Sequence, residues 1–304
     1  METRSPLLAA LMQSQDQIRR QTDLSNRTSL QASANSRILA ASDDPLAASE
    51  ANAIQARMDR IAVFQSNVTQ VKARIDSGSN TLKTIGNLAD QASNIASSVD
   101  YSSTSSLQLA VSQVDSLLEQ IVQAANFKSL NVPVLGGGAG IEPVIVTRDS
   151  LGKISSVTLA QTGEAGAVLV GEGGQTNPGA ADGASILGPS TAGGKSLIDS
   201  VIALRNALGA RDQAAVVTSQ TGITAGRTRA IEASGELGVQ SQYLDQVGDI
   251  LAQNGLDAQE RLSAIKDIDL AQATIDLQAQ ANQLRLTLAA TTRMFDNSLL
   301  DFLR

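Results

Sequence analysis

The 304-residue sequence contains no cysteine and no histidine. Their absence excludes disulfide bonds, thiol chemistry and imidazole catalysis, and it removes the usual protein ligands of zinc and haem. Tryptophan is also absent and aromatic residues make up only 2% of the chain, so any core must be built from Leu, Ile, Val and Ala. Such a composition suits thin helical bundles better than a thick globular core.

Clustered positive charge and long apolar runs are missing as well. A net charge of −7 argues against nucleic acid as the main partner, because phosphate binding needs grouped Lys and Arg. The longest apolar run near the start, Leu7 to Met12, has six residues, and Glu2 lies where a signal peptide would be basic. We therefore expect neither a cleaved signal peptide nor a membrane span, and no membrane as a partner.

The most regular pattern that is present is a long apolar repeat. Steps of three and four residues pass through Ile61, Phe64, Val68, Val71, Ile75, Gly78, Leu82, Ile85, Ala89, Ala92, Ala96 and Val99. Eleven of these twelve positions are apolar, with Gly78 as the single gap. A 3.5-residue repeat of this length keeps one narrow stripe along a helix of roughly 58 Å, which must face a long partner helix.

Two further repeats near the other end of the chain offer partners. One runs through Ile223, Gly226, Ala230, Ala233, Leu237, Gln240, Leu244, Val247 and Leu251, and the other through Leu270, Thr274, Leu277, Ala281, Leu284, Leu288, Thr291, Phe295, Ser298 and Phe302. These repeats predict a mainly α fold, an elongated antiparallel coiled coil or helical bundle formed by the N-terminal and C-terminal segments. They do not determine which helix pairs with which.

The first 41 residues predict a helix that is weak by itself. Ser5 and Pro6 are an N-cap and first-turn pair, and about 28 helical residues should follow. Its repeat passes through Leu8, Leu11, Gln15, Ile18, Thr22, Ser25, Ser29 and Ala32, which offers little apolar surface. We expect this helix to become ordered only against something else. Asp43, Asp44 and Pro45 then form a turn and cap from which the long helix starts.

Residues 133–194 differ in character, with four of the six prolines and fifteen of the 24 glycines. Residues 144–147 and 154–159 flank the turn-forming segment Asp149-Ser-Leu-Gly-Lys153, which predicts a β-hairpin. Residues 167–170 are a candidate third strand. The Gly and Pro content predicts a small β-rich insert, carried on the surface of the helices.

No motif in the chain supports catalysis or cofactor binding. The glycine-rich segments at 136–138 and 171–174 lack the spacing of phosphate-binding loops. The carboxylate pairs are explained by helix starts, at Asp44 and at Asp267 and Asp269. We therefore expect no catalytic residue, no metal and no cofactor, and a protein that is not an enzyme.

Two motifs at opposite ends of the chain carry a resemblance to a known family. Ser42-Asp-Asp-Pro-Leu-Ala-Ala48, followed by an unbroken helical pattern, resembles the flagellin superfamily, in which an Asp-Asp turn joins a short terminal helix to a long rod helix. Pro45 is typical of the hook–filament junction proteins of that superfamily (hook-associated protein 3), and the ending Ser298-Leu-Leu-Asp-Phe-Leu303 is similar to theirs. In contrast, the segment from Ala125 to Leu130 resembles flagellin itself. The resemblance covers roughly residues 1–130 and 223–304.

The resemblance implies a structural subunit of the bacterial flagellum, exported unfolded through a type III channel without a cleaved signal peptide and assembled outside the cell. The implied role is the adaptor between hook and filament, with flagellin, the filament subunit, as the alternative. A coiled-coil adhesin or a secretion-system tip protein is a third candidate. The implied partners are other copies of the chain, flagellin, a neighbouring hook-associated protein and an export chaperone.

The sequence thus predicts five segments. They are an N-terminal assembly helix (1–41), the first half of a helical rod (42–132), a variable β-rich insert (133–194), the second half of the rod (195–269) and a C-terminal assembly helix (270–304). Either all apolar stripes are satisfied within one chain, or some stay unsatisfied until other copies arrive. Under the second interpretation, the assembly interface comprises Leu8, Leu11, Ile18, Leu277, Leu284, Leu288, Phe295, Leu299 and Phe302.

Overall fold

The computed structural model confirms a mainly helical chain with small antiparallel strand pairs. It describes the backbone of residues 6–129, 131–137, 140–160, 166–176, 182–189 and 194–302, and the side chains of these ranges from residue 12 to 293. The chain divides into two compact units, which we describe separately: residues 1–60 with 254–304, and residues 61–253. Helices α2 (Pro45–Ser98) and α6 (Gln213–Lys266) each contribute residues to both units.

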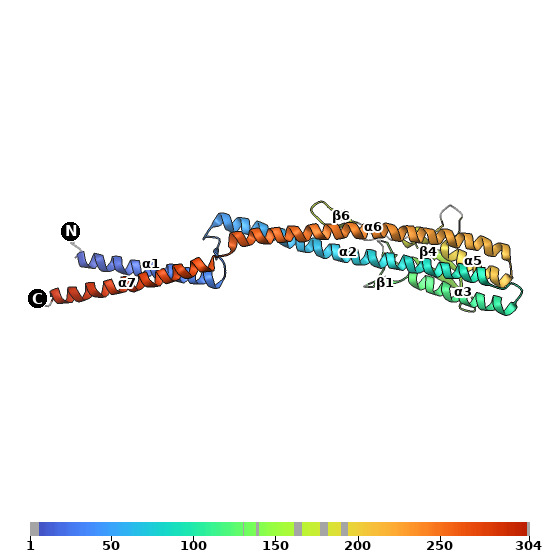
Figure 1. The fold of residues 1–304 in the computed structure, drawn as a ribbon, viewed down its shortest axis with the longest axis horizontal. Coiled ribbons are helices and arrows are strands. Elements are labelled where there is room, and N and C mark those ends of the chain that lie inside the picture. Colours follow the sequence, from blue (N-terminus) through green and yellow to red (C-terminus); the bar gives the residue numbers. More distant parts are fainter. Residues whose placement is uncertain are drawn as a thin grey trace. The chain divides into compact units, whose positions relative to one another are not determined.

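The second unit is a helical bundle built around the predicted repeat on α2. From Ile61 to Ala96 every residue of that repeat is buried except Phe64, which is half-buried, and Leu82, Ile85 and Ala89 have no exposed surface. The gap at Gly78 is buried too. Parts of α2 and α6 lie beside α3 (Thr104–Ala125) and α5 (Leu197–Ala210) in this unit (Figure 1).

The partner of the α2 repeat is α6, not the C-terminal stretch that begins at Leu270. Lys72 Nζ is 3.2 Å from Asp245 Oδ2, and Ser79 Oγ is 3.1 Å from Ser234 Oγ. Contact positions rise along α2 as they fall along α6, so the two helices are antiparallel. The predicted repeat from Ile223 to Leu251 is therefore the one that closes this core, and most of its members are buried.

Two glycines of α6 allow α5 to approach closely. A Cβ atom at Gly226 would lie 2.7 Å from Leu197 Cβ, and one at Gly222 would lie 2.4 Å from Ser200 Oγ. Helix α5 is buried on most of its sides, and Leu197, Val201, Leu204 and Leu208 have no exposed surface. The two glycines leave the room that this central position requires. Gly226 thus occupies a position of the apolar repeat because a side chain there would clash with α5.

The short strands form three separate antiparallel pairs in the described part of the chain. They are β1 (Lys128–Ser129) with β2 (Val132–Pro133), β3 (Val144–Arg148) with β4 (Ile154–Leu159), and β5 (Val168–Leu169) with β6 (Gln175–Thr176). The predicted hairpin is β3–β4. The candidate third strand does not join it, because the chain turns back after Val170, whose N–H donates to Gly174 O at 2.9 Å. Helix α4 (Gly183–Leu187) follows.

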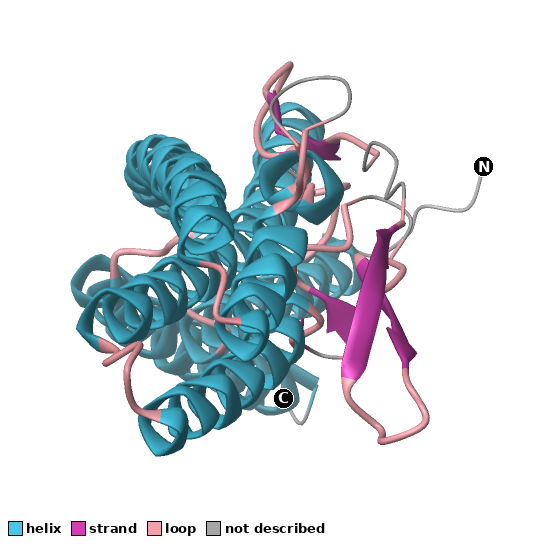
Figure 2. Cartoon of the chain, turned by 90° about the vertical axis from the view of Figure 1, so that its right-hand side faces the viewer, coloured by secondary structure: helices cyan, strands magenta, loops and turns pink. Residues whose placement is uncertain are grey.

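The insert is part of the core and not only a surface addition, which corrects the expectation from composition. Leu135, Val144, Ile154 and Leu187 are at most 1% exposed and belong to the same apolar cluster as α2 and α6. Strand β4 packs against α5 and α3, and Figure 2 shows the strands beside the helices rather than between them. Glycine and proline content predicted the turns, but not which apolar residues between them enter the core.

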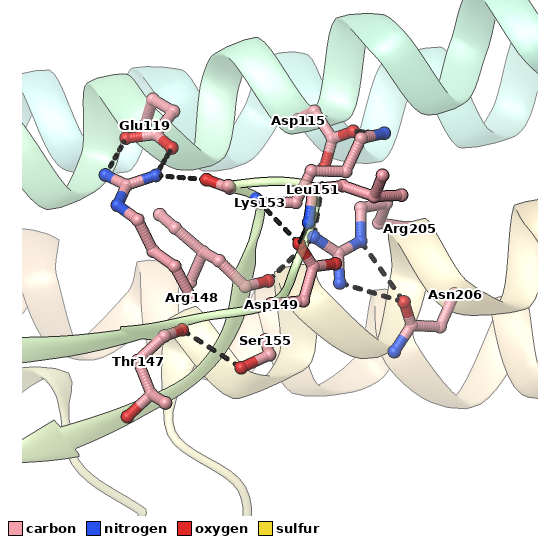
Figure 3. A network of polar contacts seen from close by, with 12 residues as sticks. Asp115, Glu119, Thr147, Arg148, Asp149, Leu151, Lys153, Ser155, Arg205 and Asn206 are labelled. Carbon is pink, nitrogen blue, oxygen red and sulfur yellow. Dashed lines mark hydrogen bonds and ion pairs between the residues drawn. The ribbon is translucent and has the colours of Figure 1, made fainter.

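Ion pairs also hold the β3–β4 hairpin against the helices (Figure 3). The Arg148 guanidinium makes two hydrogen bonds to the Glu119 carboxylate, at 2.5 and 2.9 Å, and thereby lowers the pKa of Glu119. Arg205, only 8% exposed, donates to Asp115 Oδ1 at 3.0 Å and to Ile154 O at 2.7 Å. At the turn end of the hairpin, each of these arginines therefore lies opposite a carboxylate of α3.

Replacing Asn126 with alanine should destabilise the second unit by about 1–3 kcal/mol. The Asn126 amide accepts from Val144 N at 3.0 Å and donates to Val144 O at 2.7 Å, so truncation leaves two groups of a buried residue without partners. Urea unfolding of Asn126→Ala measures the loss, with Asn87→Ala on the exposed side of α2 as the matched control. Equal midpoints for the two variants would contradict the role given to Asn126.

Candidate assembly surface

The two terminal helices form an antiparallel pair in the first unit. Helix α1 (Pro6–Ser33) lies beside α7 (Leu270–Phe302), as Figure 1 shows. The Ser14 and Thr291 hydroxyls are 3.1 Å apart, and Gln280 Nε2 donates to Thr28 Oγ1 at 3.3 Å. Helix α7 therefore pairs with the helix at the opposite end of the chain.

The face that the two helices share is mostly polar or small. Its less exposed positions are Ser14, Ile18, Gln21, Ser25, Thr28 and Ala32 on α1, and Ala273, Leu277, Gln280, Leu284, Thr287 and Thr291 on α7. Only Ile18, Leu277 and Leu284 among them carry large aliphatic side chains, and all three are half-buried. The pair thus buries little apolar surface between its own helices.

On each terminal helix, every second residue of the predicted repeat lies on the face that the two helices share in the structure. Ile18, Ser25 and Ala32 are common to both on α1, whereas Gln21 and Thr28 replace Thr22 and Ser29. A stripe that alternates steps of three and four residues can begin with either step. The two choices give neighbouring stripes with the same 3.5-residue period. With so few large apolar residues on these helices, the sequence offers no signal that distinguishes the two stripes.

Large apolar side chains instead point to the outside of the pair. The most exposed in the described part of these helices are Met12, Leu24, Leu30, Leu270, Ile275, Leu286 and Leu288. Leu286 is 71% exposed and Leu288, a predicted interface residue, is 46% exposed. Leu8, Leu11, Phe295, Leu299 and Phe302 are helical, but their side chains lie outside the described residues. Contiguous exposed apolar patches are typical of a surface that another chain covers, and Ile275 and Leu286, eleven residues apart on one side of α7, are the residues best placed to form one.

The predicted turn residues lie between α1 and α2. Asp43 Oδ2 accepts the N–H groups of Leu39 and Ala40, both at 3.0 Å, and its other oxygen is 2.7 Å from Arg27 Nη2. Asp44 Oδ1 accepts from Ala47 N at 3.0 Å, and Pro45 is the first residue of α2. This is the arrangement of an N-cap, and Pro suits the first turn because its missing N–H would have no helical partner.

Arg37, which sequence analysis did not identify, connects this turn to the end of α6. Its backbone N–H donates to Lys266 O at 2.7 Å and its Nη2 to Ile265 O at 3.2 Å, while Nη1 is 3.3 Å from Asp44 Oδ2. A guanidinium at the last carbonyls of a helix satisfies acceptors that have no partner within the helix. The connections before α2 and after α6 are therefore tied together by one side chain.

The turn should loosen in acid. The N–H groups of Ala40 and Leu39 lower the pKa of Asp43, and the N–H of Ala47 lowers the pKa of Asp44. Because the folded pKa values are lowered, the stabilisation is complete above the ordinary value of 3.8 and is lost as the pH falls through the lower folded values.

Amide hydrogen exchange at Leu39, Ala40 and Ala47 measures this loss. We expect faster exchange, after correction for intrinsic rates, as the pH falls below 3.8, the ordinary carboxyl value. In Asp43→Asn the Leu39 and Ala40 amides should lose this extra pH dependence, because the side chain no longer titrates. Unchanged protection of the original chain at the lowest pH would contradict the assignment.

Neither a membrane-spanning helix nor a metal-binding cluster is found in the described residues. No described helix combines the length and apolar character needed to span a membrane. Within the same residues, no three or more acidic side chains gather in a way that would hold a metal ion.

Comparison with solved structures gives two likenesses of fold. A structure titled as a putative flagellar hook-associated protein from Vibrio parahaemolyticus has a TM-score of 0.64 at 18% identity, covering 74% of this chain and 100% of that one. The Bacillus cereus FlgL crystal structure has a TM-score of 0.54 at 18% identity, covering 69% and 99% of the two chains. No protein-family model and no curated protein matches the sequence. At this identity the likeness shows a common fold.

Proposed function

We propose that this chain is a structural subunit of the bacterial flagellum, an adaptor that joins the hook to the filament and assembles through α1 and α7. It has no catalytic role in this proposal. The observation that carries it is the terminal helix pair, which shares a polar face and exposes large apolar side chains such as Ile275 and Leu286.

The energetics of α1 support assembly with other copies. Fixing a residue's backbone costs about 1–2 kcal/mol, and isolated helices are marginally stable in water, so the 28 residues of α1 need extensive contacts. On its side of the shared face, α1 supplies Ile18 but otherwise small or polar groups in its described part, and Leu277 and Leu284 of α7 are only half-buried. Neighbouring copies that cover Met12, Leu24 and Leu30 would add the missing apolar contacts.

Fold and motif together point to the flagellum rather than to another helical assembly. The Ser-Asp-Asp-Pro motif at 42–45 lies where a terminal helix turns into a long helix, as the superfamily resemblance implies. Two solved structures with this fold carry hook-associated names, hook-associated protein and FlgL. The proposed partners are other copies of the chain, flagellin, a neighbouring hook-associated protein and an export chaperone, and the proposed location is the extracellular flagellum.

Electron microscopy of a strain that lacks the protein tests the proposal. Hooks without filaments, together with secreted flagellin monomers in the medium, are the expected result. Hooks without filaments and no flagellin in cells or medium would identify the chain as the filament subunit, the alternative role. Normal flagella would overturn both roles and favour an adhesin or a secretion-system tip protein.

A further inference from the structure

A cavity of about 570 Å³ lies in the second unit between α2 and two of the short hairpins. One wall comes from α2 and another from the segment around β1 and β2, and Val168 of β5 completes the lining. The lining residues on α2 are Asn67, Thr69, Gln70, Val71, Ala73 and Arg74, and those around β1 and β2 are Ser129, Val132 and Val134. Sites that hold small ligands have volumes of about 300–1,000 Å³, mostly apolar walls and few polar groups. This cavity has that size and that composition.

Two side chains of α2 hold the hairpins in place around the cavity. Asn67 Nδ2 donates to Leu169 O at 2.8 Å, and Arg74 Nη2 donates to Gly137 O at 2.7 Å. The two residues are seven positions apart, so they share one face of α2 and stand about 10.5 Å apart along its axis. These two hydrogen bonds fix the segments that line the cavity to α2 at both ends of the cavity.

Arg74 carries a charge that no acidic side chain among the described residues is shown to neutralise. Buried Arg205 meets Asp115 and half-buried Arg227 meets Asp90, whereas Arg74 has only a carbonyl acceptor among the described residues. Its Nε atom is buried and has no hydrogen-bond partner there. Burial lowers the pKa of Arg74, which reflects the cost of holding a cation away from water. The described residues that line the cavity include no acidic side chain.

We infer that the cavity binds a monocarboxylate that carries a short aliphatic group, with Arg74 as its anchor. Val71, Val132, Val134 and Val168 line the space that the aliphatic part would fill. A single guanidinium, one of whose donors is already occupied by Gly137 O, neutralises one negative charge, which matches a carboxylate better than a phosphate dianion. This inference is independent of the proposed role in the flagellum.

Titration calorimetry with the intact chain tests the inference with matched probes. We expect 4-methylpentanoate to bind saturably at one site per chain, and 4-methylpentanamide, its neutral counterpart, not to bind. The peptide N-acetyl-Val-Glu-Val-amide and its Gln counterpart test whether the carboxylate belongs to a protein segment. If a carboxylate probe binds and its neutral counterpart does not, the inference is supported. Which of the two carboxylates binds shows whether the ligand is a small molecule or a protein segment. Equal binding of the neutral probes, or no binding of either carboxylate, overturns it.

Variants locate the binding at Arg74. Arg74→Gln should weaken binding of the carboxylate by about tenfold or more, because a charge-assisted hydrogen bond is lost, whereas Lys83→Gln on the exposed side of α2 should bind as the original chain does. If Arg74→Gln does not fold, Val132→Trp replaces it as the test. Val132 is 40% exposed, so a bulky side chain there should narrow the cavity while the circular dichroism spectrum stays unchanged. Unaltered affinity in a folded Arg74→Gln or Val132→Trp protein overturns the inference.

Discussion

Replacing Leu82 with alanine should lower the free energy of unfolding of the second unit by about 2–5 kcal/mol. Leu82 lies at the centre of the α2 repeat and has no exposed surface. Truncation removes apolar contacts and leaves a cavity, since Ile85, about one turn further along α2, is also fully buried and is held in place by the helix. Thermal or urea unfolding of the purified chain measures the change.

Asn80 provides the matched control for this experiment. It is exposed, two residues from Leu82 on the same helix, and Asn80→Ala should change the free energy of unfolding by no more than about 0.5 kcal/mol. Because helix propensity favours alanine over asparagine, the sign of this small change is expected to be stabilising. Equal losses in the two variants would mean that the apolar repeat does not carry the stability of the bundle.

Replacing both Ile275 and Leu286 with serine should abolish assembly while leaving the monomer as stable as before. Both side chains are exposed, at 60% and 71%, and their spacing of eleven residues places them on one side of α7. Removing exposed side chains changes monomer stability by about 0.5 kcal/mol each. In an assembly, each of the two substitutions would remove the burial of a large aliphatic side chain. The loss is about 1.5–3 kcal/mol per substitution in each copy, and it recurs at every contact between copies.

Motility of a strain that carries the double variant in place of the original gene measures assembly. The control is Leu109→Ser with Leu151→Ser, which removes two exposed leucines, 60% and 81% exposed, from the second unit. We expect the control strain to swim and the α7 variant to be non-motile with secreted flagellin. Motility in both strains would show that this side of α7 is not an assembly surface.

Hydrogen exchange on the monomer adds a test that needs no strain. The terminal helices should exchange fast because their shared face is mostly polar, whereas residues 61–99 and 223–251 should be protected by the apolar core. Deleting residues 296–304 should leave that protected core unchanged and abolish attachment. Termini as protected as the core in the free monomer would contradict assembly-coupled ordering.

Some residues that make contacts between distant segments have no recognisable signal in the sequence. Arg37 bonds to carbonyls 228 residues away in the chain and Arg74 to one 63 residues away, and neither belongs to a motif. Asp43, Asp44 and Pro45 were recognisable because capping depends on residues within one turn of each other. Interactions between residues that are close together in the chain can be predicted from the sequence, whereas contacts between distant segments cannot.

The mainly helical class, the 3.5-residue repeat of α2, the helix start at Pro45 and the β3–β4 hairpin could all be predicted from the amino-acid order. Each depends on the spacing of residues within about ten positions, which sets the side of a helix that is buried or the geometry of a turn. The folded chain was needed to show that α2 pairs with α6 and α1 with α7, that the insert enters the core, and which stripe of α1 faces α7. Those outcomes depend on how surfaces far apart in the chain fit together, and several apolar repeats of equal period are interchangeable until their side chains pack.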